Sequence, residues 1–529
     1  AAHTLSLAAR GEAFDAAAQA SGGWNGDAWS GVIGSLQNRG RYAMSLAKPV
    51  PLRLAVAPGA GAMGLVRPQQ IAFNGAVIAL PAGTINIASL TKDGRRWSSK
   101  GSASGVPLSY LAQFSPALHD NMRGDLSLGG EWGLDLQSAA VAGGAPQLAG
   151  MVHVFREKGD LVVGSSVPVV LGLRTLDLRA DVAGGALRTR VNVDGVRAGV
   201  AQIDATTELV GGRLGTGSPL RLSATADMAS IAWMAPLLGQ PGLELNGAMK
   251  LAVTGAGTIG SPTLNGTIDG DNLAVRWPEQ GVRLRNGQLR AQLAGDQLLL
   301  RRLSFDGVQG NALADGAIRF AGGEATMQLK LVANKLEALS RPDRTVVVSG
   351  TGTVNRTATS FNVDGKFRVD RALVELAPQG RPTMSDDVIV LGRTSAAAKA
   401  RERAAMPLEA DIEIDLGESF RLRGMGADTE LAGTVRVRTG DNRAPRVNGT
   451  IRAVNGTYAA YGQKLTIERG VLTFSGRYDN PALNVRAVRK RPEGEQLSET
   501  NVEAGVEVRG TALAPVAKLV STPSVPDSE

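Results

Sequence analysis

Short segments in which apolar and polar residues alternate recur along this chain. In residues 411–416 (DIEIDL) every second residue is apolar and the residues between are acidic. Successive side chains of a β-strand point to opposite faces, so each such segment has one dry face and one wet face. Buried parallel strands would instead read as continuous Val/Ile runs. The pattern therefore predicts an all-β protein of mostly antiparallel strands. It recurs in residues 327–331 (MQLKL), 435–438 (VRVR), 483–487 (LNVRA) and 502–509 (VEAGVEVR).

Turn signals separate these segments. Gly accounts for 67 of the 529 residues, aromatic residues for only 4%, and Cys is absent, which excludes a disulfide framework and thiol chemistry. Such a composition favours many turns and a core of small aliphatic side chains. Five dipeptides of the kind that closes tight hairpins predict turns in an antiparallel meander. They are Asn265-Gly266, Asn286-Gly287, Asp306-Gly307, Asn448-Gly449 and Asn455-Gly456.

A weak internal repeat and a few helical segments complete the predicted organisation. Residues 261–268 (SPTLNGTI) reappear as residues 444–451 (APRVNGTI). A short helix is expected from Asp227 to Leu238, with an Asp cap and with Pro236 disturbing its end. Residues 395–405 are rich in Ala, Lys, Arg and Glu and are also prone to form a helix.

No residue set predicts catalysis, a cofactor or a metal. Residues 255–260 (GAGTIG) match the dinucleotide fingerprint, but turn and strand residues follow where that fingerprint needs a helix, so a glycine-rich hairpin is expected. His3, His119 and His153 are scattered and have no second ligand at metal spacing. A pair of carboxylates that meet in space, as in a glycosidase, stays open as an alternative. We expect a protein that is not an enzyme.

The charge pattern bears on partners. The net charge of +8 is compatible with nucleic acid or with anionic lipid head groups. The densest basic run, residues 486–491, contains no aromatic residue on which a base could stack, so no nucleic-acid partner is expected. No window reaches the roughly 18 apolar residues that a membrane-spanning helix needs.

Several motifs lie in the last third of the chain. They are residues 420–433 (FRLRGMGADTELAG), 455–476 (NGTYAAYGQKLTIERGVLTFSG), 479–485 (DNPALNV), 508–515 (VRGTALAP) and 519–523 (LVSTP). Together they resemble the C-terminal region of the TamB family, the inner-membrane component of the translocation and assembly module. Residues 225–350 look similar to the AsmA-like repeats of the same lipid-transfer superfamily, whereas the likeness before residue 150 is only compositional.

The resemblance implies an elongated, U-shaped (taco-like) β-sheet groove with an apolar interior. It implies a protein that crosses the periplasm from an N-terminal anchor in the inner membrane, and that anchor is expected to lie outside this chain. The implied partners are phospholipids, an Omp85-type outer-membrane barrel (TamA-like) and outer-membrane protein clients. The domains expected on this basis are an N-terminal β-repeat portion at 1–150, groove repeats at 151–380, an exposed linker or helical excursion at 381–406 and the hallmark region at 407–529.

Two functions follow from the resemblance, and a third class stays open. The first is a groove that conducts phospholipid between the two membranes without any catalytic residue. The second is an assembly factor whose sheet edge templates strands of outer-membrane barrels and autotransporters. A β-solenoid adhesin is the third. For the first function, the lipid-lining residues expected from the alternation are Met327, Leu329, Leu331, Ile412, Ile414, Leu416, Val435, Val437, Leu465, Ile467, Leu483 and Val485.

Overall fold

The computed structural model describes residues 2–11, 14–56, 68–114, 122–139, 145–163, 168–321, 324–357, 359–376, 408–440, 444–460, 463–490 and 503–522. Strands make up 76% of the chain and helices 4%, which confirms the predicted all-β class with few short helices. Thirty of the strands belong to one hydrogen-bonded sheet, which is mostly antiparallel as predicted.

The chain divides into two compact units, which are described separately below. Unit 1 consists of Ala1–Asp271 with Gln292–Asp296, and unit 2 consists of Asn272–Ala291 with Gln297–Glu529. The domain boundaries expected near residues 150, 380 and 406 stay predictions, and residues 377–407, which include the expected linker and the helix-prone residues 395–405, lie outside the described residues.

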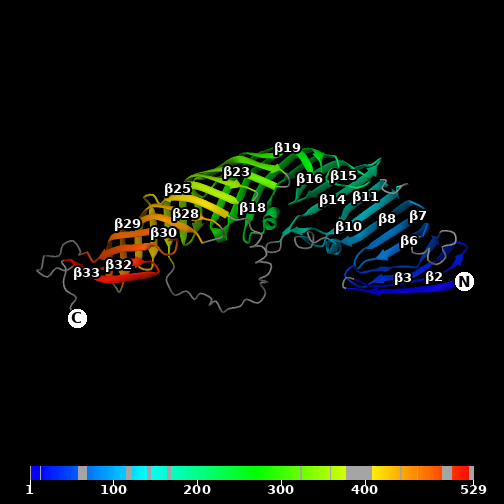
Figure 1. Ribbon diagram of the computed structural model, residues 1–529, viewed down its shortest axis with the longest axis horizontal. Helices are drawn as coiled ribbons and strands as arrows, with labels where there is room; N and C mark the ends of the chain where they lie inside the picture. Colours follow the sequence, from blue (N-terminus) through cyan, green and yellow to red (C-terminus); the bar gives the residue numbers. More distant parts are fainter. Residues whose placement is uncertain are drawn as a thin grey trace. The chain divides into compact units, whose positions relative to one another are not determined.

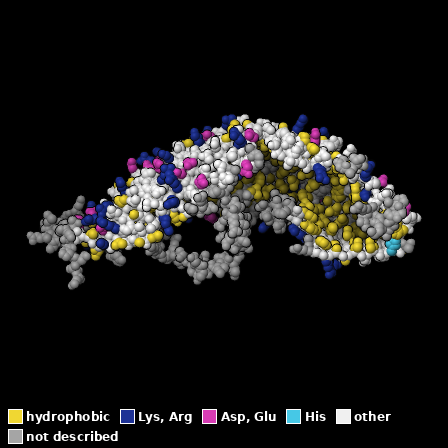
Figure 2. All heavy atoms as spheres, viewed as in Figure 1, with side chains coloured by type: hydrophobic (Ala, Val, Ile, Leu, Met, Phe, Trp, Pro, Cys, Tyr) yellow, Lys and Arg dark blue, Asp and Glu magenta, His cyan; other side chains and the backbone are white. Residues whose placement is uncertain are grey.

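Unit 1 is a run of antiparallel strands in which most strands pair with their neighbours in the chain (Figure 1). Its hydrophobic side chains line a hollow in the sheet, which Figure 2 shows as a yellow concavity. The strands are β1 (Ala2–Arg10), β2 (Asp15–Asn25), β3 (Ala28–Asn38), β4 (Met44–Leu46), β5 (Val50–Ala55), β6 (Gln70–Ala79), β7 (Thr84–Asp93), β8 (Arg96–Pro107), β10 (Ser127–Gln137), β11 (Gln147–Lys158), β14 (Leu173–Ala183), β15 (Ala186–Gly195), β16 (Gly199–Glu208), β17 (Leu220–Met228) and β18 (Glu244–Thr258), and β19 (Ser261–Trp277) begins in this unit.

Long connections at one edge of unit 1 fold into a small structure that we call the rim cap. Its elements are α1 (Leu108–Leu111), η2 (Ala112–Phe114), η3 (Ala232–Leu238) and a three-stranded sheet of β9 (Met122–Arg123), β12 (Val162–Val163) and β13 (Val169–Val170). Its buried core includes Leu126 and Val163, and the half-buried Val154 and Leu176 of the large sheet pack against this core. The rim cap therefore covers part of the apolar face of unit 1.

The helix expected from Asp227 to Leu238 is only partly correct. Asp227 lies in β17, where its backbone pairs with Lys250, so it cannot cap a helix. The helical residues begin at Ala232 and form the 3₁₀ helix η3, which ends at Leu238 and is followed by the cap residue Gly239 with a φ of 64°. The sequence pattern did not indicate that β17 continues to pair with β18 as far as residue 228.

Unit 2 is likewise built from the strands of a mostly antiparallel sheet. Two of its pairings are parallel, because β25 pairs with both β26 and β27. The other pairings described for this unit are antiparallel. Its strands are β20 (Val282–Gly295), β21 (Gln297–Asp306), β22 (Asn311–Ala321), β23 (Glu324–Arg341), β24 (Arg344–Arg356), β25 (Phe361–Glu375), β26 (Leu408–Asp415), β27 (Phe420–Gly424), β28 (Ala427–Thr439), β29 (Arg446–Ala460), β30 (Gln463–Arg477), β31 (Ala482–Val488), β32 (Glu503–Thr511) and β33 (Ala514–Thr522).

Four of the five predicted hairpin turns are wrong. Asp306-Gly307 does lie in a turn, where the Gly307 N–H donates to the Gly310 carbonyl, and residues 255–260 form the expected glycine-rich hairpin between β18 and β19. The four Asn-Gly pairs instead lie inside β19, β20 and β29.

Mid-strand glycines explain two of these pairs. Gly266 and Gly449, the matching positions of the internal repeat, have φ values of 152° and 134°. A Cβ at either position would lie 2.0 or 2.3 Å from a carbonyl oxygen of the neighbouring strand. The glycine therefore permits a bend within a continuing strand, where the sequence pattern suggested a reversal of the chain.

Candidate apolar groove

The strand register gathers apolar residues of unit 2 on one face of the sheet. Leu331 pairs with Gly352, Gly352 with Gly365, Gly365 with Ile412 and Ile412 with Val437. Side chains of directly paired residues lie on the same face, so β23 to β28 share one apolar row. The neighbouring rows of this face contain Leu329, Ile414 and Val435, and Met327 lies on the same face towards the end of β23.

The same face continues through the last strands and becomes a groove there. Val485 pairs with Val508 and Val508 with Ala517, while Tyr458 pairs with Leu465. The cavity has a volume of about 690 Å³, and we call it the C-terminal groove. Its lining residues are Ala427, Tyr458, Gln463, Leu465, Ile467, Val485, Ala487, Arg489, Ala504, Gly505, Val506, Val508, Ala517 and Leu519.

The twelve expected lining residues are not equally accessible. Leu465, Ile467 and Val485 line the C-terminal groove. Leu416 and Val435 are buried, with exposed fractions of 6% and 7%, and Leu416 packs in a cluster with Val369 and Ala372. The other ten are half-buried. That these side chains contact lipid stays a prediction.

Several lining residues were missed from the sequence although the signal was present. Val506 and Val508 belong to the alternating segment 502–509, and Leu519 pairs with Val506 across β32 and β33. Leu519 is 80% exposed, so this part of the face is open to solvent among the described residues. Tyr458 and Arg489 carry no alternation signal, because each lies close to the end of its strand.

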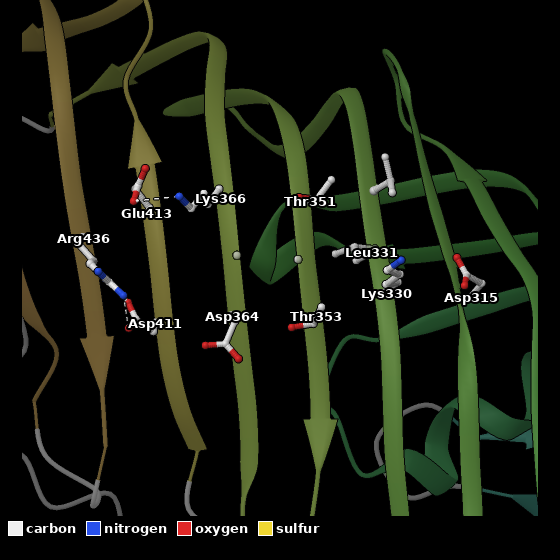
Figure 3. Close-up of a pocket in the computed structure, with 13 residues that line it drawn as sticks. Asp315, Lys330, Leu331, Thr351, Thr353, Asp364, Lys366, Asp411, Glu413 and Arg436 are labelled. Atoms are coloured by element: carbon white, nitrogen blue, oxygen red, sulfur yellow. Dashed lines mark hydrogen bonds and ion pairs between the residues drawn. The ribbon is translucent and has the colours of Figure 1, made fainter.

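The opposite face of unit 2 is charged, and its basic and acidic side chains form ion pairs with one another. Arg436 Nη2 lies 2.7 Å from Asp411 Oδ2, and Lys366 Nζ lies 3.8 Å from Glu413 Oε2 (Figure 3). The hydrogen bond from Arg436 lowers the pKa of the Asp411 carboxyl below its ordinary value. These residues border a hollow of about 640 Å³. Since its charges are matched across the strands, we interpret this face as a solvated ion-pair ladder.

The three histidines do not gather. His3 Nε2 accepts a hydrogen bond from Trp29 Nε1, His153 Nε2 lies 2.6 Å from Asp177 Oδ2, and His119 lies outside the described residues. Within the described parts of the chain, no group of three His, Cys, Asp or Glu side chains is placed to hold a metal ion. In the same residues, no helix has the length and apolar character needed to cross a bilayer.

An all-β sheet with one charged face and one half-exposed apolar face defines a groove-forming class of protein. The family model for the TamB C-terminal domain matches residues 301–529. The translocation and assembly module subunit TamB of Haemophilus influenzae is 25% identical over 299 residues, which are 54% of this chain and 23% of that relative. The match thus spans about a quarter of the relative's length. The match of residues 301–529 to the TamB C-terminal domain confirms the resemblance seen in the motifs.

Proposed function

We propose that this chain is part of an envelope translocation and assembly system and that its apolar face carries phospholipid acyl chains between the inner and outer membranes. The observation that carries the proposal is the open apolar C-terminal groove. In the whole protein the groove would cross the periplasm from an inner-membrane anchor to an Omp85-type, TamA-like barrel. The name of the relative, a translocation and assembly module subunit, supports the coarser part of this proposal.

The groove is chemically suited to acyl chains. Leu465, Val485 and Val508 present hydrocarbon to a cavity that is open to water. Covering such a surface contributes about 0.8 kcal/mol for each methylene buried. Because successive strands present similar small aliphatic side chains, neighbouring positions along the face offer similar stabilisation. An acyl chain can therefore slide along the face without leaving a deep energy minimum.

A second function is favoured by the edge of the sheet. Among the described residues, β33 pairs with β32 along one edge, and no strand pairing is described along its other edge. Such an edge can accept a further strand by β-augmentation. An assembly factor would use this edge to hold strands of outer-membrane protein clients, with β33 as the template.

Site-specific photo-crosslinking separates these functions. A photoreactive residue at Ile414 or Val485 would report on the apolar face, and one at Glu413 or Arg486 on the charged face. Lipid transport predicts phospholipid adducts at the first pair only, in protein purified from cell envelopes without added lipid. Adducts with client polypeptide at either pair, or lipid adducts at both faces equally, would argue against a lipid groove.

A further inference from the structure

One cationic side chain reaches the otherwise uncharged C-terminal groove. Arg489 directly follows β31, and its backbone N–H donates to the Ala504 carbonyl at 2.9 Å. This bond fixes the backbone of Arg489 beside the first residues of β32, and the exposed side chain of Arg489 lines the groove. No Asp or Glu is among the described residues that line the groove.

Several arginines of unit 2 form ion pairs with carboxylates on the charged face. Arg421 Nη2 lies 2.9 Å from Asp428 Oδ2, and Arg469 Nη2 lies 2.8 Å from Glu507 Oε1. Arg489 differs, because within the described residues no carboxylate lies within ion-pair distance of its guanidinium. Its positive charge is therefore available to an anionic ligand at the mouth of the groove.

We propose that Arg489 binds the phosphate of a phospholipid whose acyl chain lies in the C-terminal groove. This inference rests on the proposed function, since it assigns the head-group position of the same lipid. The acyl chain contacts Leu465, Val485 and Leu519, and the phosphate faces the guanidinium at the boundary with water. The Gln463 amide, which also lines the groove, is a second donor for the phosphate or the glycerol oxygens.

The chemistry of the groove distinguishes a lipid from other sources of phosphate. A guanidinium binds phosphate through paired N–H donors, which a neutral lipid cannot accept in the same way. A free phosphate would leave the adjoining hydrocarbon surface uncovered, whereas a phospholipid satisfies the cation and covers the aliphatic side chains. The groove is thus matched to an amphiphile with an anionic group at one end.

The test measures binding of two fluorescent lipids to the purified 529-residue chain. The lipids are a tail-labelled phosphatidylglycerol and a diacylglycerol with the same tails. We expect Arg489→Gln to weaken phosphatidylglycerol binding about tenfold, because the substitution removes one charge-assisted hydrogen bond. Diacylglycerol binding should be unchanged. Arg489→Lys should retain most of the affinity, because it keeps the charge.

Matched controls make each outcome informative. Arg452→Gln removes an exposed positive charge from β29, on the face of the sheet opposite to the groove, and should leave the binding of both lipids unchanged. Equal binding of phosphatidylglycerol by the wild type and Arg489→Gln would overturn the head-group assignment but leave the groove proposal intact. Failure of the wild type to bind either lipid would overturn both. Competition by glycerol phosphate at the affinity of the whole lipid would show a site for free phosphate and would also refute the assignment.

Discussion

The rim cap of unit 1 and the C-terminal groove of unit 2 start from the same alternating strands but differ in what covers the apolar face. In the rim cap, the chain's own short elements cover it, and Leu126 is only 2% exposed. In the C-terminal groove the described residues include no such cover, and Leu519 is 80% exposed.

This difference shows that strand alternation creates an apolar face without determining what lies on it. A buried core forms where long connections between strands supply a second layer. Between β32 and β33 the connection is a short hairpin, and the described residues supply no second layer over the face there. A second layer from the chain itself therefore distinguishes the structural core from the candidate binding surface.

The largest expected effect is at the rim cap. Leu126→Ala should lower the free energy of unfolding by about 2–5 kcal/mol, because the substitution leaves a cavity among side chains that cannot all collapse into it. Denaturant unfolding followed by circular dichroism measures the change. A loss below about 1 kcal/mol would mean that the cap is not a packed core, and the comparison between the two regions would fail.

A smaller loss is expected at a strand bend of unit 2. Gly350 has a φ of 157°, and a Cβ there would lie 2.2 Å from the Lys366 carbonyl oxygen. Gly350→Ala should destabilise the protein by about 1–3 kcal/mol through backbone strain. Gly440→Ala is the control, because nothing lies within 4 Å of its Cβ position. Equal unfolding midpoints for the two variants would contradict the proposed bend.

A substitution in the C-terminal groove should have little effect on the stability of the lipid-free protein but a clear effect on lipid binding. Leu465 is half-buried, so Leu465→Ala should change the free energy of unfolding by about 1 kcal/mol or less in the absence of lipid. Bound phospholipid should increase that difference, because it covers the side chain. Thermal unfolding with and without phosphatidylglycerol measures both values, and a large loss without lipid would show that protein already covers the groove.

The smallest expected effect is a loss of stability of unit 2 at acidic pH. Hydrogen bonds from neighbouring arginines lower the pKa of Asp411, Asp428 and Asp479 below the ordinary 3.8. A lowered folded-state pKa contributes stability that is present above the ordinary pKa and is lost as the pH falls through the folded value. Stability should therefore be level from about pH 7 to about pH 5 and decline below about pH 4. The decline should be modest because the pairs are exposed.

Hydrogen exchange can localise that decline. Strands β26 to β31 carry these ion pairs, so their amides should lose protection at acidic pH before those of the rim cap, whose core is aliphatic. Replacing Asp428 with Asn should remove part of the pH dependence in β27 and β28. Simultaneous loss of protection in both regions would show that the acid response is not set by these pairs.

Much of the fold could be predicted from the sequence, but its turns could not. The alternation in residues 411–416 and 435–438 identified strands and their faces, because side-chain direction has a period of two in any strand. The Asn-Gly pairs misled the prediction, because a glycine with positive φ serves equally in a hairpin turn and in a mid-strand bend. Only the partner strand, whose carbonyl oxygen lies close to Gly266 or Gly449, decides between them.

The sequence predicted the kind of residues that line the candidate site but not which of them are accessible. Leu465, Ile467 and Val485 were expected from alternation and line the C-terminal groove, whereas Leu416 was expected to be accessible and is buried. Its burial depends on Val369 of β25, a strand that precedes it by more than forty residues and pairs in parallel with β26. A local pattern contains no information on such a partner.

By itself, then, the sequence determined an all-β chain with one apolar and one charged face, because local side-chain periodicity is enough to specify both. Tertiary structure decided which parts of the apolar face are covered, where the strands bend and which basic side chain lines the C-terminal groove. Those properties depend on pairings between strands that are distant in the chain. Arg489 shows the distinction: the sequence identifies a basic residue in a basic run, and the fold brings it to the mouth of an apolar groove.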